Sequence, residues 1–166
     1  GHKGIGKSLF INLFLKFVFS LNDVNSNIDN IIENNSHPNI FKINKNIDKN
    51  NIDINQIRKM IHFQNLSSFN NMNKFIIIED IENLNINSAN ALLKSLEEPN
   101  KNLFFLLTYN LGGKIPDTIK SRCLEFKMSL SIDEVKIIVN NYFNYNIYEL
   151  ISKDFVNHYN SPSFYI

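Results

Sequence analysis

Two short apolar runs stand out in the middle of the chain, at residues 75–78 and 103–108. Short runs of this kind are typical of strands that are buried on both faces of a parallel sheet. Between them, the apolar positions recur at helical spacing: Ala89, Leu92, Leu93 and Leu96. Asn87 or Ser88 is the expected N-cap of this helix, and Pro99 is expected to end it. The order strand, helix, strand predicts a βαβ unit and an α/β fold.

The N-terminal part of the chain predicts one helix and one further strand. Residues 7–19 are expected to form the helix, and Phe10, Phe14 and Phe17 to supply part of its buried face. Residues 40–43 are apolar with one lysine and predict the strand.

Two capped amphipathic helices are predicted on either side of the βαβ unit. Residues 52–62 predict the first, with Asp53 able to cap its first turn. Residues 131–134 read Ser-Ile-Asp-Glu, a capping box that would open the second. A closing strand is expected at residues 124–127, and a last helix at residues 148–158.

The composition limits the class of protein. The chain has 166 residues, 43% of them hydrophobic, which is enough for one domain with a real core. The net charge of +1 gives no general attraction to nucleic acid, so any DNA contact must be local or made by partners. One cysteine argues against a disulfide framework and a four-ligand zinc site. No apolar run is long enough to span a bilayer.

The first eight residues, GHKGIGKS, match the phosphate-loop pattern G-x-x-x-x-G-K-[ST]. The glycines at Gly1, Gly4 and Gly6 would let backbone N–H groups turn toward phosphate oxygens. Lys7 would reach the outer phosphates and Ser8 would ligate Mg²⁺. ATP and Mg²⁺ are therefore the expected cofactors. The alternative is a glycine-rich turn that precedes a helix by chance.

Glu79 and Asp80 follow directly after the first apolar run. Carboxylates at the C-terminal end of a parallel strand are where such sheets place their chemistry, here Mg²⁺ binding and polarisation of the attacking water. Glu79 could approach the metal through its water shell. The alternative is a pair of solvated charges at a strand end.

Two other reactive residue types favour structural roles. His37 has no second histidine, cysteine or carboxylate at ligand spacing, so a structural role is preferred over catalysis or metal binding. Cys123 has no activating histidine near it in the sequence, which favours a small buried hydrophobic residue over a nucleophile.

The segment NALLKSLEEP at residues 90–99, followed by Ser-Arg-Cys at 121–123, resembles the clamp-loader branch of the AAA+ ATPases. His-Pro-Asn at 37–39 and the alanine-rich start of the helix are most similar to the delta' subunits of bacterial DNA polymerase III. The resemblance implies a P-loop AAA+ three-layer α/β fold with a parallel sheet. It further implies a nucleotide-binding domain over 1–128 and the start of a small helical lid domain over 129–166.

The resemblance also implies segments outside this sequence. In that family a strand precedes the phosphate loop, and a helical collar follows the lid. The chain is therefore expected to be truncated at both ends and to be poorly stable when expressed alone.

The resemblance assigns roles to several residues. Asn110 stands at the sensor 1 position, which contacts the γ-phosphate. Arg122 looks like an arginine finger, which stabilises charge on ATP bound by a neighbouring subunit; the alternative is an arginine paired with local acids. Active sites of this family read Asp-Glu where this chain has Glu79-Asp80. The shorter Asp80 is not expected to reach the lytic water, so the chain's own ATPase activity is expected to be weak or absent.

The function implied is that of a delta' subunit, which supports ATP-dependent loading of the sliding clamp as part of the DNA-directed DNA polymerase holoenzyme, a nucleotidyltransferase complex. Expected partners are the gamma/tau and delta subunits, the sliding clamp, and primer–template DNA through the complex. No zinc and no membrane are expected, and the implied location is cytoplasmic. Two alternatives stay open: an active clamp-loader ATPase subunit, gamma/tau-like or replication-factor-C-like, and a non-replicative AAA+ remodelling protein.

Overall fold

The computed structural model describes residues 1–21, 28–45, 51–144 and 161–166. The chain divides into two compact units, one of residues 8–125 and one that joins residues 1–7 with residues 126–166. The helix predicted at residues 148–158 lies outside the described residues.

A three-stranded parallel sheet forms the centre of the larger unit. Its strands are β1 (Ile40–Ile43), β2 (Lys74–Ile78) and β3 (Leu103–Leu107), and β2 lies between the other two. Every residue of β2 is buried. This burial confirms that the first apolar run is a strand covered on both faces, as parallel strands in α/β proteins are.

The register brings the ends of the three strands to one edge of the sheet. Ile43 lies opposite Ile78, and Ile78 lies opposite Leu107. The residues that follow these strands, among them Glu79 and Thr108, therefore line the same edge.

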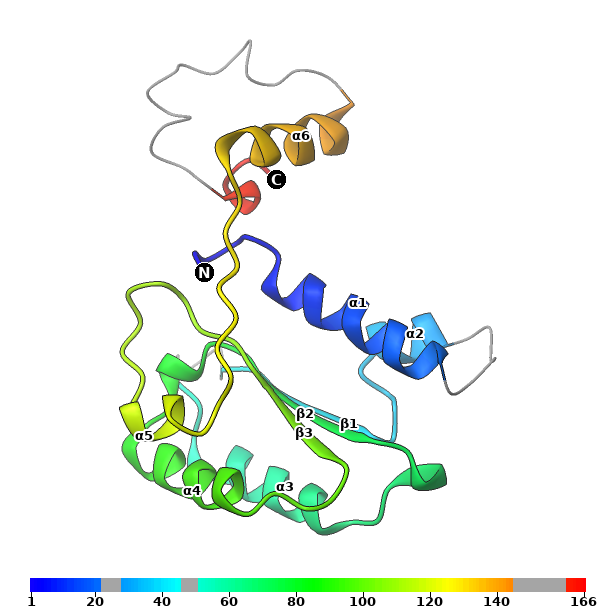
Figure 1. Ribbon diagram of the computed structural model, residues 1–166, viewed down its shortest axis with the longest axis vertical. Helices are drawn as coiled ribbons and strands as arrows, with labels where there is room; N and C mark the ends of the chain where they lie inside the picture. Colours follow the sequence, from blue (N-terminus) through cyan, green and yellow to red (C-terminus); the bar gives the residue numbers. More distant parts are fainter. Residues whose placement is uncertain (22–27, 46–50, 145–160) are drawn as a thin grey trace. The chain divides into compact units, whose positions relative to one another are not determined.

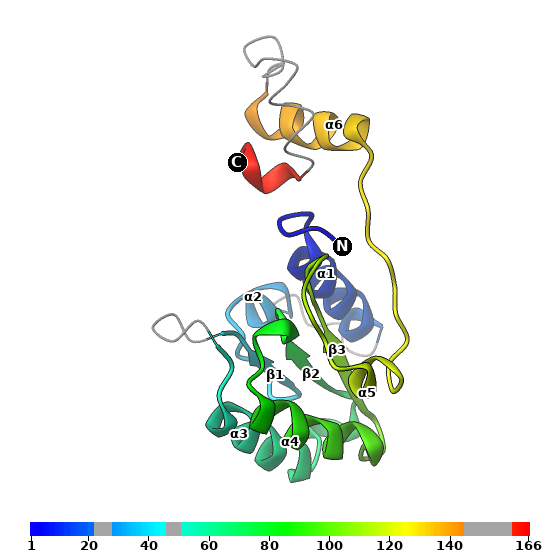
Figure 2. The same ribbon diagram turned by 90° about the vertical axis from the view of Figure 1, so that its left-hand side faces the viewer.

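Helices cover both faces of the sheet (Figure 1). Helices α3 (Ile54–Asn65) and α4 (Ile86–Glu97) lie on one face, and α1 (Lys7–Ser20) and α2 (Ile28–Glu33) lie on the other, as Figure 2 also shows. The larger unit is thus a three-layer α/β arrangement, as predicted.

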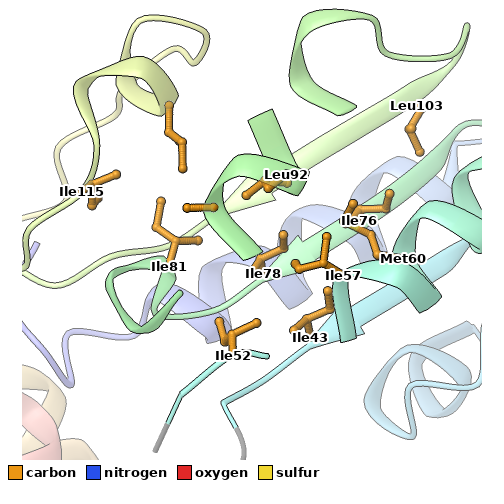
Figure 3. Packing of buried hydrophobic residues seen from close by; sticks show 12 residues of the cluster. Ile43, Ile52, Ile57, Met60, Ile76, Ile78, Ile81, Leu92, Leu103 and Ile115 are labelled. Atoms are coloured by element: carbon orange, nitrogen blue, oxygen red, sulfur yellow. The ribbon is translucent and has the colours of Figure 1, made fainter. Parts of the chain in front are cut away.

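The face under α3 and α4 carries the larger part of the core. Ile76 and Ile78 point toward it from β2, and Ile57 and Met60 of α3 meet them with Leu92 of α4 (Figure 3). All five side chains are fully buried. The helical spacing of Ala89, Leu92, Leu93 and Leu96 therefore predicted the face of α4 that meets the core: the first two are buried, and the other two are half-buried against it.

The opposite face shows where the prediction for α1 was wrong. Ile11, Leu15 and Phe19 are its buried residues, and they pack with Phe75 and Ile77 of β2.

Phe10, Phe14 and Phe17, which were expected to be buried, are exposed by 57%, 38% and 61%. The helix is apolar on nearly all sides, so its sequence contains two apolar stripes; the sheet buries one of them, and of the other only Phe14 has a ring contact with the sheet, edge-to-face with Phe75. Among the described residues, no helix is long and apolar enough to cross a membrane.

The helix caps are mostly those expected. Asp53 accepts hydrogen bonds from the backbone of Asn55 and Gln56, and Gln56 closes the capping box. The N-cap of α4 is Asn85, however, and not Asn87 or Ser88. Its side chain accepts the Ser88 N–H at 2.8 Å, because the helix begins one residue before the first of the expected caps.

Short elements complete the described chain. They are the single-turn helices η1 (Phe69–Asn71), η2 (Ile81–Asn83), α5 (Asp117–Lys120) and η4 (Pro162–Phe164), and the longer α6 (Ile132–Phe143). Ser131 and Glu134 form the predicted capping box of α6.

Residues 124–127 form no strand, contrary to the prediction. Leu124 and Phe126 are more than four-fifths exposed. The segment has the apolar alternation of a strand but lies beside no other strand in the described sheet.

Lys74, the first residue of β2, is a buried lysine whose ammonium group caps the C-terminus of α3. Its ammonium donates to the carbonyl oxygens of Phe63 and Leu66, the latter at 2.7 Å, and lies 4.2 Å from the centroid of the Phe63 ring. Burial lowers the pKa of this ammonium group from its ordinary value. The side chain thus supplies donors to the carbonyl groups that a helix C-terminus leaves unpaired.

Replacing this lysine, Lys74→Met, should lower the free energy of unfolding by about 2 kcal/mol, because the carbonyl oxygens at the end of α3 lose their charged donor. Urea unfolding measures this loss as a reduced midpoint. Lys59→Met is the matched control on the exposed surface of α3 and should change the midpoint little. Equal effects of the two substitutions would show that Lys74 does not act as the cap.

Candidate functional site

The phosphate-loop segment belongs to the smaller unit. Gly4 and Gly6 have φ angles of 80° and 91°, in the left-handed region that side chains disfavour. Lys7 turns back on the loop, and its ammonium donates to the carbonyl oxygens of His2 at 2.7 Å and Gly1 at 3.4 Å. The glycine spacing read from the sequence therefore matches a real requirement of the backbone.

Close packing adds a second requirement at two of these glycines. A Cβ atom at Gly4 would lie 1.7 Å from the hydroxyl oxygen of Ser163, and one at Gly1 would lie 2.4 Å from the carbonyl oxygen of Met128. Any larger residue at either position would displace its neighbour.

The predicted carboxylates lie at the C-terminal edge of the sheet in the larger unit. Glu79, directly after β2, forms an ion pair with Lys42 of β1, with 3.0 Å between the ammonium nitrogen and Oε1. Only 20% of the Glu79 side chain and 16% of the Lys42 side chain are exposed. The first carboxylate of the predicted metal site thus already has a cation beside it.

Asp80 and Asn110 meet, as their positions at the ends of neighbouring strands imply. The Asn110 side-chain amide donates to Asp80 Oδ1 at 2.9 Å and to Glu82 Oε1 at 2.6 Å. The backbone N–H of Asn110 also donates to Glu82 Oε1, at 3.1 Å. One amide therefore joins the second predicted carboxylate to a third acid that the sequence reading did not single out.

The backbone of Asp80 is itself unusual. Its φ and ψ are 54° and 56°, a left-handed conformation that aspartate tolerates better than most residues, and its N–H donates to the Thr108 hydroxyl at 3.1 Å. The chain turns sharply here, and this turn brings Glu82 back beside Asn110.

Sequence reasoning missed Lys42, Glu82 and Thr108. The signals available were a lysine inside an apolar strand and a third acid in the run Glu-Asp-Ile-Glu at residues 79–82. Neither signal shows which residue Lys42 or Glu82 contacts, because each contact is made with a residue that follows a different strand.

This edge does not fit a resident Mg²⁺ ion as it stands. Magnesium prefers carboxylate oxygens and water, whereas the Lys42 ammonium already lies beside Glu79, and one oxygen each of Asp80 and Glu82 accepts from the amide of Asn110. Among the described residues, no three histidine, cysteine, aspartate or glutamate side chains are grouped as metal ligands.

Arg122 makes its contacts elsewhere, just beyond the C-terminus of α5. One guanidinium nitrogen donates to Glu97 Oε1 of α4 at 2.8 Å, and another donates to the carbonyl oxygen of Thr118 at 2.9 Å. The Arg122 and Glu97 side chains are 36% and 50% exposed. The local ion pair that was weighed against the finger role exists, and it lies at the surface.

Cys123 and His37 both have structural surroundings. Burial raises the pKa of the Cys123 thiol, and the residue packs against the core under α4. The His37 ring lies 4.0 Å from that of Phe19, and its Nδ1 accepts the N–H of Asn39. A raised thiol pKa disfavours the reactive thiolate, as expected for a packing cysteine.

Comparison with known proteins connects this geometry to clamp loaders. The chain is 34% identical over 90 residues to DNA polymerase III subunit delta' of Pseudomonas aeruginosa, covering 54% of this chain and 27% of that protein. It is 31% identical over 105 residues to the delta' subunit of Haemophilus influenzae, covering 63% and 32%. DNA polymerase III subunit gamma of Buchnera aphidicola (subsp. Schizaphis graminum) is 44% identical over 61 residues, covering 37% and 17%. The chain thus spans a third or less of the length of these relatives.

A solved structure supports the fold. A DNA polymerase III gamma subunit-related protein from Thermotoga maritima superimposes with a TM-score of 0.55 and 26% identity, covering 67% of this chain and 38% of that chain. The fold is therefore the α/β P-loop AAA+ fold with a parallel sheet.

The family assignment comes from a family model described as DNA polymerase III, delta subunit, which matches residues 1–131. That match extends over more than half of the 166 residues. The chain therefore belongs to this family of DNA polymerase III clamp-loader subunits.

Proposed function

We propose that this protein acts as a delta' subunit of the DNA polymerase III clamp loader and presents Arg122 to ATP bound by a neighbouring subunit. The observation that carries the proposal is the state of Arg122, which is exposed beyond the end of α5 and held by a surface ion pair with Glu97, the carbonyl oxygen of Thr118 and the hydroxyl of Ser121. Family membership and the delta' relatives support the same role.

The contacts of Arg122 suit a residue that has to exchange partners. A surface ion pair such as Arg122–Glu97 contributes only about 0–1 kcal/mol, so little is lost when the guanidinium leaves Glu97. The gain is larger, because a guanidinium fork forms paired, charge-assisted hydrogen bonds with phosphate oxygens. Glu97 would hold Arg122 in place until a subunit with ATP docks.

The chain's own nucleotide site is proposed to bind ATP and to hydrolyse it weakly or not at all. Gly4, Gly6 and Lys7 would hold the phosphates. The negative charge of ATP would be bound by the backbone N–H groups of the loop and by the Lys7 ammonium. Lys42 pairs with one oxygen of Glu79, and Asn110 donates to one oxygen of Asp80, and both contacts compete with the orientation of a water molecule.

The partners follow from the same role. They are the gamma/tau and delta subunits and the sliding clamp, with primer–template DNA contacted through the assembled complex. The net charge of +1 on the chain supports indirect rather than independent DNA binding. The proposed setting is DNA replication in the cytoplasm.

The test of the weak-hydrolase part compares the full-length protein with its Lys7→Ala variant. We expect both to hydrolyse ATP at the same rate, close to background in a phosphate-release assay, because the site lacks a free catalytic carboxylate. An active clamp-loader ATPase is the positive control.

The second candidate is an active ATPase subunit of the gamma/tau type. The observation that favours it is the complete phosphate-loop motif, with Lys7 and Ser8 both present, together with 44% identity to a gamma subunit over 61 residues. Rapid hydrolysis by the full-length protein that Lys7→Ala abolishes would establish this candidate and contradict the weak-hydrolase proposal.

A further inference from the structure

Among the ion pairs of the described residues, the one between Lys42 and Glu79 has the least exposed side chains. It joins two strands that are neighbours in the sheet but far apart in the sequence. With four-fifths or more of both side chains covered, water screens this pair less than it screens Arg122–Glu97.

The surroundings of Glu79 require a cation at this place. Its Oε1 atom is fully buried and accepts no hydrogen bond of good geometry within the described part of the chain. The Lys42 ammonium at 3.0 Å is therefore what compensates this oxygen for the loss of water. A buried carboxylate oxygen with neither a hydrogen bond nor a neighbouring cation would strongly destabilise the fold.

We propose that the Lys42 ammonium takes the place beside Glu79 that a divalent cation takes in a hydrolysing nucleotide site. The inference rests on the proposed role of Glu79 as the metal-facing carboxylate of this chain's own site. It goes further, because it names a residue that keeps the metal out. Lys42 then keeps a divalent cation away from Glu79.

Electrostatic repulsion from the Lys42 ammonium would exclude a divalent cation from Glu79. An ammonium group and a divalent cation on the same carboxylate repel each other across a few ångströms, and partial burial weakens the screening of that repulsion. Of the neighbouring acids, Asp80 and Glu82 each have one oxygen bonded to Asn110, and the second oxygen of Glu82 is buried, so the Lys42 charge also opposes a cation that would reach this oxygen. Removing the lysine charge leaves an uncompensated carboxylate, which is the group that a hard cation prefers.

The test uses Lys42→Met in the full-length protein, since methionine keeps much of the side-chain volume and removes the charge. Mn²⁺ binding is followed by electron paramagnetic resonance, and Tm is followed in Mg²⁺ at constant ionic strength. We expect Lys42→Met to bind Mn²⁺ at least about tenfold more tightly than the unchanged protein. Its Tm should be lower without metal and should rise with Mg²⁺, because binding to the folded state stabilises it.

Three further proteins make the experiment decisive. Lys42→Arg keeps the charge and should show no gain in Mn²⁺ binding. Lys42→Met combined with Glu79→Gln should lose the gain, which assigns the new site to Glu79. Lys101→Met removes an exposed charge before β3 and should behave like the unchanged protein.

Two outcomes would overturn the inference. One is Mn²⁺ binding by the unchanged protein that Glu79→Gln abolishes, a measurement that does not depend on whether Lys42→Met folds. The other is a folded Lys42→Met protein with unchanged Mn²⁺ affinity. Neither outcome touches the arginine-finger role, which is measured at Arg122 in the assembled complex.

Discussion

Arg122→Ala in the assembled clamp loader should slow ATP hydrolysis at the neighbouring subunit's site by about a thousandfold. Arginine fingers contribute on the order of 10³–10⁵ to the rate because they stabilise charge that develops on the transferred phosphoryl group. The measurement is clamp-dependent ATP turnover by a reconstituted loader in which the other sites are disabled at their phosphate-loop lysines. Arg122→Lys should recover little of the rate, because an ammonium group lacks the planar fork.

Two control variants separate the finger from general surface charge. Lys120→Ala removes an exposed cation two residues away and should leave turnover within about twofold of the unchanged protein. Glu97→Ala releases Arg122 from its surface pair and should change turnover by less than about fivefold. Full turnover by Arg122→Ala would sink the arginine-finger assignment.

Leu92→Ala in the full-length protein should lower the free energy of unfolding by about 3–4 kcal/mol. Leu92 is fully buried at the centre of the core between α4 and the sheet. Truncation removes buried methyl and methylene groups and leaves a cavity that a sheet with rigid neighbours cannot close. Urea unfolding gives the change as a reduced midpoint at constant slope.

Leu93→Ala is the matched control, because it makes the same change one residue along the same helix at a half-buried position. It should cost about half as much or less. Leu92→Met, which keeps the volume, should cost less than about 1.5 kcal/mol. If the free energy of unfolding of Leu92→Ala were equal to or higher than that of Leu93→Ala, the core around Leu92 would not be a main source of the domain's stability.

Local patterns in the sequence predict a large part of this fold. The apolar run at β2 indicates a strand buried on both faces because only a sheet covered by helices can hide every residue of such a run. The Asp53 and Ser131 caps are predicted for a similar reason, since a capping box involves only residues three positions apart.

The errors come from places where local patterns permit two answers. Helix α1 carries apolar residues on both sides, so only the position of the sheet decides that Leu15 is buried and that Phe17 is exposed. Likewise, Asn85, Asn87 and Ser88 are all good caps, and the start of α4 is decided by what the helix packs against. Residues 124–127 have the composition of a strand but no partner in the described sheet.

The site is less predictable than the fold. Glu79 and Asp80 could be identified because they follow a buried strand, where parallel sheets place their chemistry, and Asn110 only because the resemblance places it at the sensor 1 position. Lys42 and Glu82 could not, because their roles depend on which side chains reach one another across strands and turns. A sequence lists the acids of a site, but it does not show which of them lies beside a lysine, as Glu79 lies beside Lys42.

The fully parallel pairing of β1, β2 and β3 also governs how the protein is made. Each strand reaches its neighbour only through a long crossover, so no part of this sheet can start as a hairpin. Loop closure has to precede the burial of β2, which makes folding slow compared with that of a helical bundle of equal length. Until both neighbours have docked, the isoleucine-rich edges of β2 are open to strands of other chains. β2, in which every residue is buried in the folded protein, is therefore the strand most prone to aggregation while the protein is being synthesised.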